Sequence, residues 1–138
     1  MTESVRKLVA RTSYVTGALA VVLSPVPLAD EIAFLPVFGV MATRIAKTHG
    51  LAMRDVPWRP IVATTVAALA ARATVNVAVS YIPGVAAVAN AVSAVTVTRM
   101  LGSYMDQACG EPGATQALSF KEIAGRMRDA LRKPKVAN

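Results

Sequence analysis

The strongest constraint on this chain is an uncharged run of 26 residues, 73–98, with Ile82-Pro83-Gly84 near its middle. A run of that length is typical of a membrane-spanning helix. Proline and glycine at its centre favour two shorter helices folded back on each other instead. An arginine borders each end, at Arg72 and Arg99. The run therefore predicts an antiparallel helical hairpin with an apolar turn.

Small apolar residues dominate the composition. The 138 residues include 26 Ala and 20 Val, but 10 Leu and seven aromatics. Alanine buries little area per residue, yet it lets helix backbones approach closely, which is how helices associate in lipid. The length and composition favour one small helical domain, packed tightly either in a membrane or in a soluble bundle.

The chain is also basic, with 15 Lys and Arg against eight Asp and Glu, a net charge of +7. Such a charge is typical of proteins that meet nucleic acid or anionic lipid. The basic clusters contain almost no aromatic side chains for stacking on bases, and no nucleic-acid-binding motif is present. With a mean hydropathy of +0.48, lipid is the expected partner and nucleic acid is not.

Turn and cap residues divide the chain into four core helices, which we expect to form two antiparallel hairpins in an all-α fold. The first hairpin joins residues 4–23 and 31–49 through a turn containing Pro25 and Pro27, with Asp30 as N-cap of the second helix. Gly50 is the expected C′ residue that ends this helix. The second hairpin joins residues 60–81 and 85–107.

The two predicted hairpins share one asymmetry. Both turns are apolar, whereas the N-terminus, the 44–59 connector and the tail are basic. By the positive-inside rule the basic ends would lie on the cytoplasmic side. The uncharged stretches 12–23 and 32–43 would extend only about 18 Å as helices, short of a hydrocarbon core near 30 Å. We therefore expect either hairpins that insert partway into a membrane or a bundle that protects its polar groups, rather than four spanning helices.

The N-terminus has some character of a signal peptide, because basic residues precede an apolar stretch, 15–23. Cleavage after Ala29 would need a small residue at the third position back, where Pro27 stands. A retained helix is the expectation.

Small residues recur every four positions on the third and fourth predicted helices, which suggests a seam where the two helices face each other. The seam residues are Ala63, Ala67, Ala71, Arg72 and Asn76 on one helix and Ala86, Asn90, Ala94, Thr98 and Gly102 on the other. Asn76 and Asn90 are expected to hydrogen-bond across it, with Arg72 as a further partner. We interpret the seam as helix packing rather than a ligand site.

Residues 1–110 are expected to form the helical-hairpin domain, and 111–138 a loop and a tail helix. Ser119 and Glu122 fit a capping box. The stripe Phe120, Ile123, Ala124, Met127 and Leu131 makes the tail amphipathic. It would bind lipid or a partner, or pack on the bundle, and its basic residues are Lys121, Arg126, Arg128, Arg132, Lys133 and Lys135.

No catalytic motif is recognisable. Asp30 and Glu31 are adjacent, so their side chains are expected to point apart on a helix. His49 and Cys109 are the only residues of their kind, so a cysteine–histidine metal site and an internal disulfide are excluded. No serine lies in a Gly-x-Ser-x-Gly context, and no phosphate-binding glycine loop occurs. We expect neither an enzyme nor a cofactor.

Several short patterns, in order, resemble a bacterial family known only as domain of unknown function 697. They are residues 25–30, the helix end 45–50, the pair 71–72, and the turn 82–84 with the helix that follows it. Leu28, Ala71 and Ala86 stand where that family usually has glycine. Members occur beside Era-like GTPase modules or in inner-membrane proteins of the YcjF type. The resemblance implies a helical, membrane-associated domain and no known reaction.

The sequence thus predicts a non-enzymatic helical protein of the bacterial inner membrane. It would self-associate and present a basic cytoplasmic face to lipid or to a partner. The alternative is a cytoplasmic helical scaffold or adaptor that forms a homo-oligomer or binds a GTPase in trans.

Overall fold

The computed structural model describes residues 1–26, 28–82 and 85–132. Over these residues the chain is all-helical, as predicted, with five helices and no strand. The helices are α1 (Glu3–Leu23), α2 (Ala29–Thr48), α3 (Trp58–Val79), α4 (Ala86–Gly110) and α5 (Phe120–Arg132). Each boundary lies within three residues of the expected one. The helix break expected within the uncharged run is present, although Pro83 and Gly84 lie outside the described residues, as does Pro27.

Local signals explain most helix ends. Thr2 caps α1, since its side-chain oxygen accepts a hydrogen bond of 3.3 Å from the backbone N–H of Val5. Gly50 ends α2 with a φ of 71°, and the N–H of Leu51 reaches back to the carbonyl of Ala46 at 3.0 Å. Glycine adopts this left-handed conformation at little cost, so the predicted role of Gly50 is confirmed.

The predicted N-cap of α2 was wrong. Leu28 occupies that position, with a left-handed φ of 64° and no side-chain cap. The helix therefore starts at Ala29, earlier than expected, and Asp30 lies inside its first turn. Its carboxylate turns into the bundle towards Arg72 instead of capping the helix.

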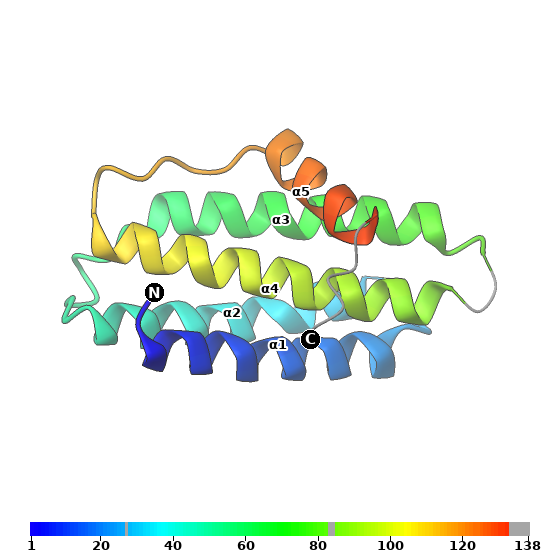
Figure 1. The fold of residues 1–138 in the computed structure, drawn as a ribbon, viewed down its shortest axis with the longest axis horizontal. Coiled ribbons are helices and arrows are strands. Elements are labelled where there is room, and N and C mark those ends of the chain that lie inside the picture. Colours follow the sequence, from blue (N-terminus) through cyan, green and yellow to red (C-terminus); the bar gives the residue numbers. More distant parts are fainter. Residues whose placement is uncertain (27, 83–84, 133–138) are drawn as a thin grey trace.

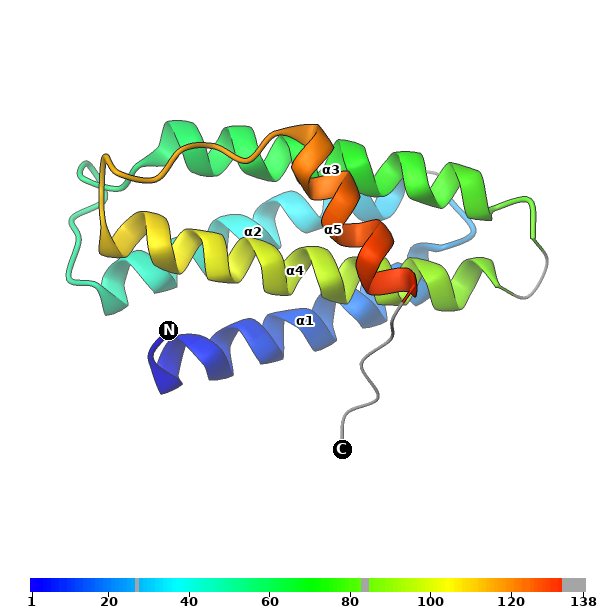
Figure 2. The same cartoon turned by 45° about the horizontal axis from the view of Figure 1, so that its top comes forward.

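Helices α1 to α4 lie lengthwise beside one another, and successive helices run in opposite directions (Figure 1). The C-terminal halves of α1 and α3 and the N-terminal halves of α2 and α4 form one end, which we call the tip. The opposite end, with the 49–57 connector, is the base. Helix α5 crosses α3 and α4 obliquely (Figure 2).

The small residues of α4 serve a different contact from the predicted one. The most extensive helix contact is between α1 and α4, where a Cβ on Gly102 would collide with the side chain of Val9. The hydroxyls of Thr16 and Thr98 meet at 2.7 Å in the same interface. Thr98 and Gly102 thus face α1 rather than α3, because their small volume lets α1 approach.

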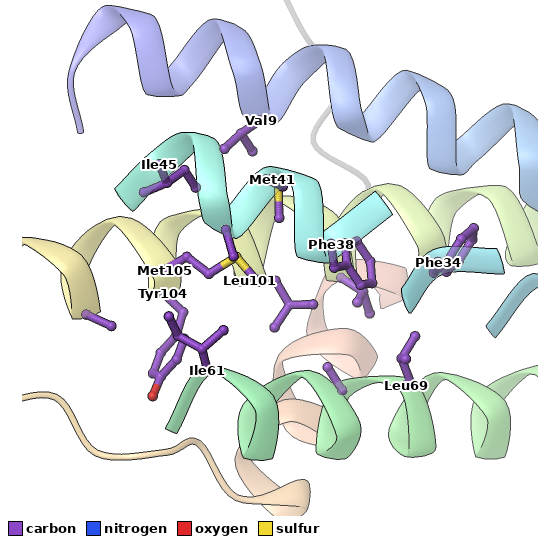
Figure 3. Packing of buried hydrophobic residues seen from close by; sticks show 14 of the residues in the cluster. Val9, Phe34, Phe38, Met41, Ile45, Ile61, Leu69, Leu101, Tyr104 and Met105 are labelled. Atoms are coloured by element: carbon purple, nitrogen blue, oxygen red, sulfur yellow. The ribbon is translucent and has the colours of Figure 1, made fainter. Parts of the chain in front are cut away.

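An apolar core fills the space between the helices (Figure 3). Helix α2 contributes a row of large side chains, including Phe34, Phe38, Met41 and Ile45, each at most 1% exposed. Leu101 and Met105 of α4 meet them from the other side. Burial of these side chains, at about 1.5–3 kcal/mol each, stabilises the bundle along α2, from Phe34 in the tip half to Ile45 at the base.

The tail follows one of the three expected alternatives, because it packs on the bundle. The capping box is confirmed by the bond from the Ser119 N–H to Glu122 at 2.8 Å and the reciprocal bond to the Ser119 hydroxyl at 3.3 Å. Ile123 and Met127 are buried, whereas Phe120 stays 45% exposed. Helix α5 therefore packs on α3 and α4 and buries Ile123 and Met127.

Candidate functional site

Arg72 is the centre of the most distinctive site. Its side chain is 0% exposed, and its guanidinium donates to two carboxylates of α2. One terminal nitrogen lies 2.6 Å from Glu31 Oε1, and the other lies 2.7 Å from Asp30 Oδ2. Adjacent carboxylates on α2 can therefore hold one guanidinium, although sequence reasoning expected them to point apart.

Asparagine side chains extend this cluster to all four long helices. Asn90 of α4 accepts hydrogen bonds from Arg72 and, at 2.8 Å, from Asn76 of α3. The Asn90 amide in turn donates to the carbonyl of Ala20 in α1 at 2.7 Å. Ser93 completes the set, donating to the Asn90 carbonyl at 2.9 Å. We call Arg72, Asp30, Glu31, Asn76, Asn90 and Ser93 the Arg72 cluster.

The cluster has a structural consequence for the bundle. Helices α2 and α3 make the least extensive contact among the helix pairs that touch. The two carboxylate–guanidinium bonds cross this weak boundary, because the acids lie on α2 and Arg72 lies on α3. Charge-assisted hydrogen bonds are roughly twice as strong as neutral ones. The cluster therefore compensates for sparse apolar packing there.

The guanidinium is not fully satisfied. Its Nε has no hydrogen-bond partner among the described residues. Its central carbon instead lies 4.7 Å from the centroid of the Phe34 ring, which is a cation–π contact. An arginine held this way is expensive to bury without its carboxylates, so Arg72, Asp30 and Glu31 must be considered as one unit.

The two carboxyl groups share one cation, and their pKa values move apart. Burial opposes ionisation of Asp30, but hydrogen bonds with Glu31 and Arg72 outweigh it and lower the pKa of Asp30. Burial and the hydrogen bond with Asp30 raise the pKa of Glu31 to about 7, against the attraction of Arg72. Near neutral pH the Glu31 carboxyl is therefore partly protonated, while the Asp30 carboxyl stays ionised.

A cavity of about 370 Å³ opens beside the cluster at the tip. Polar groups of Asp30, Glu31, Asn76 and Asn90 line it together with apolar residues such as Val26 and Val77. The polar side chains of the cluster thus form one wall of this cavity.

The outside of the tip is apolar. Its helices and connections expose large hydrophobic side chains, between 37% and 82% of each. These are Val21, Val22, Val26, Leu28, Ile32, Leu35, Val77, Tyr81, Ile82, Val85, Val88 and Val92. We call this set the apolar tip surface. Large apolar patches are uncommon on soluble monomers, so these exposed side chains are candidates for a contact with lipid or protein.

The base end carries a different polar contact. His49 and Asp106 are joined at 2.8 Å, and Asp106 also lies 3.6 Å from the N-terminal amine. Cys109 is buried close by, and burial, reinforced by the Asp106 charge, raises the pKa of its thiol. A thiol in that state is a weak nucleophile. Among residues 1–26, 28–82 and 85–132, no three of His, Cys, Asp or Glu come together as a metal site.

The remaining predicted site residues make no hydrogen bond within the cluster, although Ala86 lines the cavity beside it. Ala71 and Ala94 are buried, whereas Ala63 is exposed and Ala67 and Ala86 are half-buried. Pro25 and Ile82 are exposed at the tip. The side chains of Lys121, Arg126, Arg128 and Arg132 are exposed on α5. Lys133 and Lys135 lie outside the described residues.

The Asp30–Arg72 and Glu31–Arg72 pairs are the feature that sequence reasoning missed. A signal was present, since Asp30 and Glu31 are the only charges between residues 12 and 43, and Arg72 is the only one between 60 and 98. Charges of opposite sign in otherwise apolar helices are expected to pair with each other.

No protein-family model, curated protein or solved structure matches this chain. Within the described residues, α3 is the one helix long and apolar enough to cross a membrane by length and composition. A buried core helix passes the same test, so α3 alone is weak evidence for a membrane. The functional argument therefore depends on the Arg72 cluster and the apolar tip surface together.

Proposed function

We propose that this chain is a non-enzymatic, membrane-associated helical protein that inserts its tip into lipid and keeps its basic base in the cytoplasm. One observation carries the proposal: at the tip the charges are inside and the hydrophobic side chains are outside. Arg72 is 0% exposed, whereas Val22 and Ile32 are 72% and 70% exposed. Polar groups that face the bundle interior are typical of helices in a membrane.

We further propose that two antiparallel hairpins, α1–α2 and α3–α4, with α5 across the second, are the structural units. The opposite directions of successive helices and the contacts within each pair support this arrangement. The uncharged stretches 12–23 of α1 and 32–43 of α2 suit insertion into about one leaflet, since 12 residues extend about 18 Å. The resemblance to family 697 is compatible with this function. It depends only on the short sequence patterns described above.

Vesicle flotation tests the proposal. The double substitution Val22→Asp with Val88→Asp adds two charges to exposed sites on the apolar tip surface. It should lower association with phosphatidylcholine vesicles about tenfold or more, because a carboxylate in lipid costs on the order of 1–3 kcal/mol. The matched control, Met53→Asp with Val62→Asp, changes two similarly exposed side chains at the base and should float like the unaltered protein. Equal flotation of all three would contradict insertion of the tip.

The second candidate is a soluble scaffold whose apolar tip surface is covered by another copy of the chain. The same exposed valines favour it, because an oligomer would also remove them from water. Mass in detergent-free solution distinguishes the two: a discrete oligomer that fails to float with vesicles supports the scaffold. A GTPase in trans is supported only by the family resemblance.

A further inference from the structure

A groove of about 610 Å³ runs between the outer faces of α1 and α2. Its volume is within the usual range for small-molecule sites. Three cationic side chains line it, Lys7, Arg11 and Arg44, together with three valines, Val15, Val37 and Val40. The groove is separate from the Arg72 cluster and from the cavity beside it.

The cations and the valines lie at different levels along the groove. Helix α1 runs from base to tip, so Lys7 and Arg11 come before Val15. Helix α2 runs from tip to base, so Val37 and Val40 come before Arg44. The cations therefore lie at the base side of the groove and the valines at the tip side. The groove repeats, along one face, the polarity of the whole bundle.

The two arginines are available to an anion. Lys7 is paired with Glu3 at 2.6 Å. Arg11 and Arg44 form no salt bridge with any residue in the described part of the chain. Towards the tip from these arginines, Val15 and Val40 are 50% and 53% exposed. An occupant with an anionic head and an apolar chain would match both levels.

We propose that this groove binds one anionic phospholipid, with the phosphate at Arg11 and Arg44 and an acyl chain along the valines towards the tip. The inference rests on the proposed membrane association, because the lipid would have the orientation of the surrounding leaflet only if the tip is inserted. It goes beyond that function by assigning a discrete site and a class of lipid.

Native mass spectrometry of the detergent-purified protein with added phosphatidylglycerol tests the site. The double substitution Arg11→Gln with Arg44→Gln should reduce retained phosphatidylglycerol about tenfold or more, since each cation near an anionic lipid contributes about 1 kcal/mol. The control Arg54→Gln with Arg59→Gln removes the same charge from exposed positions outside the groove and should retain the lipid. Equal loss in both doubles would show general charge attraction and overturn the site.

A second variant tests the apolar half without altering charge. Val40→Trp would fill the groove and should displace the phospholipid, whereas retention equal to that of the unaltered protein would overturn the acyl-chain placement. Flotation with neutral phosphatidylcholine vesicles separates this inference from the proposed function. If the unaltered protein floats but Arg11→Gln with Arg44→Gln retains as much phosphatidylglycerol as the control double, the groove site is rejected and insertion of the tip is not. If the unaltered protein does not float but the groove double alone loses phosphatidylglycerol, the site is supported and insertion of the tip is rejected.

Discussion

The two ends of this bundle place polar and apolar groups in opposite ways. At the base, Ile45, Leu101 and Met105 are buried and arginines face outward, although Met53 and Val62 are exposed there as well. At the tip, Arg72 and Asp30 are buried, and valines face outward. The same four helices form both ends. The distribution of charged and apolar side chains therefore changes along the bundle, which a composition averaged over the chain conceals.

The difference also concerns what holds each end together. Large apolar side chains meet at the base, so burial of hydrophobic area stabilises it. Fewer large side chains are buried at the tip, and the Arg72 cluster links α1, α2, α3 and α4 by hydrogen bonds. The tip should therefore be sensitive to the loss of one charge, and the base should not.

Removing Arg72 should have the largest effect. Arg72→Met leaves Asp30 and Glu31 buried without their cation, which is expected to cost about 3–5 kcal/mol of unfolding free energy. Chemical unfolding in detergent measures it. Adding Asp30→Asn and Glu31→Gln to the same variant should recover part of the loss, because no unpaired charge then remains.

The base supplies the comparison for that experiment. His49→Gln alters the hydrogen bond between His49 and Asp106, whose side chains are 24% and 13% exposed. Partly exposed pairs contribute about 0–1 kcal/mol. Equal losses for His49→Gln and Arg72→Met would mean that the two ends do not differ in this way.

The contact between α1 and α4 should be next in sensitivity. Gly102→Ala places a methyl group against Val9, and such overpacking costs about 1–3 kcal/mol. The matched change Gly39→Ala meets no atom within 4 Å and should be neutral or slightly stabilising, because alanine favours helix. Thermal unfolding compares the two, and tolerance of Gly102→Ala would contradict the close approach of α1.

A pH dependence should belong to the tip. The pKa of Glu31 is raised from 4.5 to about 7 on folding, so the folded state binds this proton more tightly than the unfolded chain. The resulting stabilisation is complete below about pH 4.5 and is lost as the pH rises through 7. One pKa unit corresponds to about 1.4 kcal/mol, so we expect the total to be at most about 3 kcal/mol.

Glu31→Gln tests this assignment, since glutamine cannot titrate. Unfolding midpoints measured between pH 4.5 and 8 should fall for the unaltered protein and stay nearly level for the variant. An unchanged slope in Glu31→Gln would place the titrating group elsewhere.

The smallest expected effect is a gain in stability. Leu28 has a left-handed φ of 64°, which costs an ordinary residue about 1 kcal/mol relative to glycine. Its side chain is 57% exposed, so Leu28→Gly should stabilise the fold by up to about 1 kcal/mol while slightly weakening vesicle association. Leu28→Ala keeps the strain and serves as control. A destabilised Leu28→Gly would mean that the Leu28 side chain contributes more than its exposure suggests.

Local signals predicted the helices well, because prolines, Gly50 and the Ser119 capping box each act within a few residues. Long-range contacts were predicted only in part. The hydrogen bond between Asn76 and Asn90, with Arg72 as a further partner, is confirmed, whereas the partner helix of Thr98 and Gly102 was predicted wrongly. Thr98 and Gly102 fit α3 or α1 equally well by spacing, and only packing selects α1. The sequence predicts Asp30 as a cap because capping is a local role, whereas its partner in the structure, Arg72, is 42 residues away.

The most direct test of the central claim places a fluorescent probe at each end. Trp58, the only tryptophan, lies at the base, and Tyr81, 82% exposed, lies at the tip. In vesicles with bromine-labelled acyl chains, Tyr81→Trp combined with Trp58→Phe should give blue-shifted, strongly quenched emission, while the unaltered protein should keep unquenched Trp58 emission. An unquenched tip tryptophan, or equal quenching of both probes, would contradict insertion by the tip.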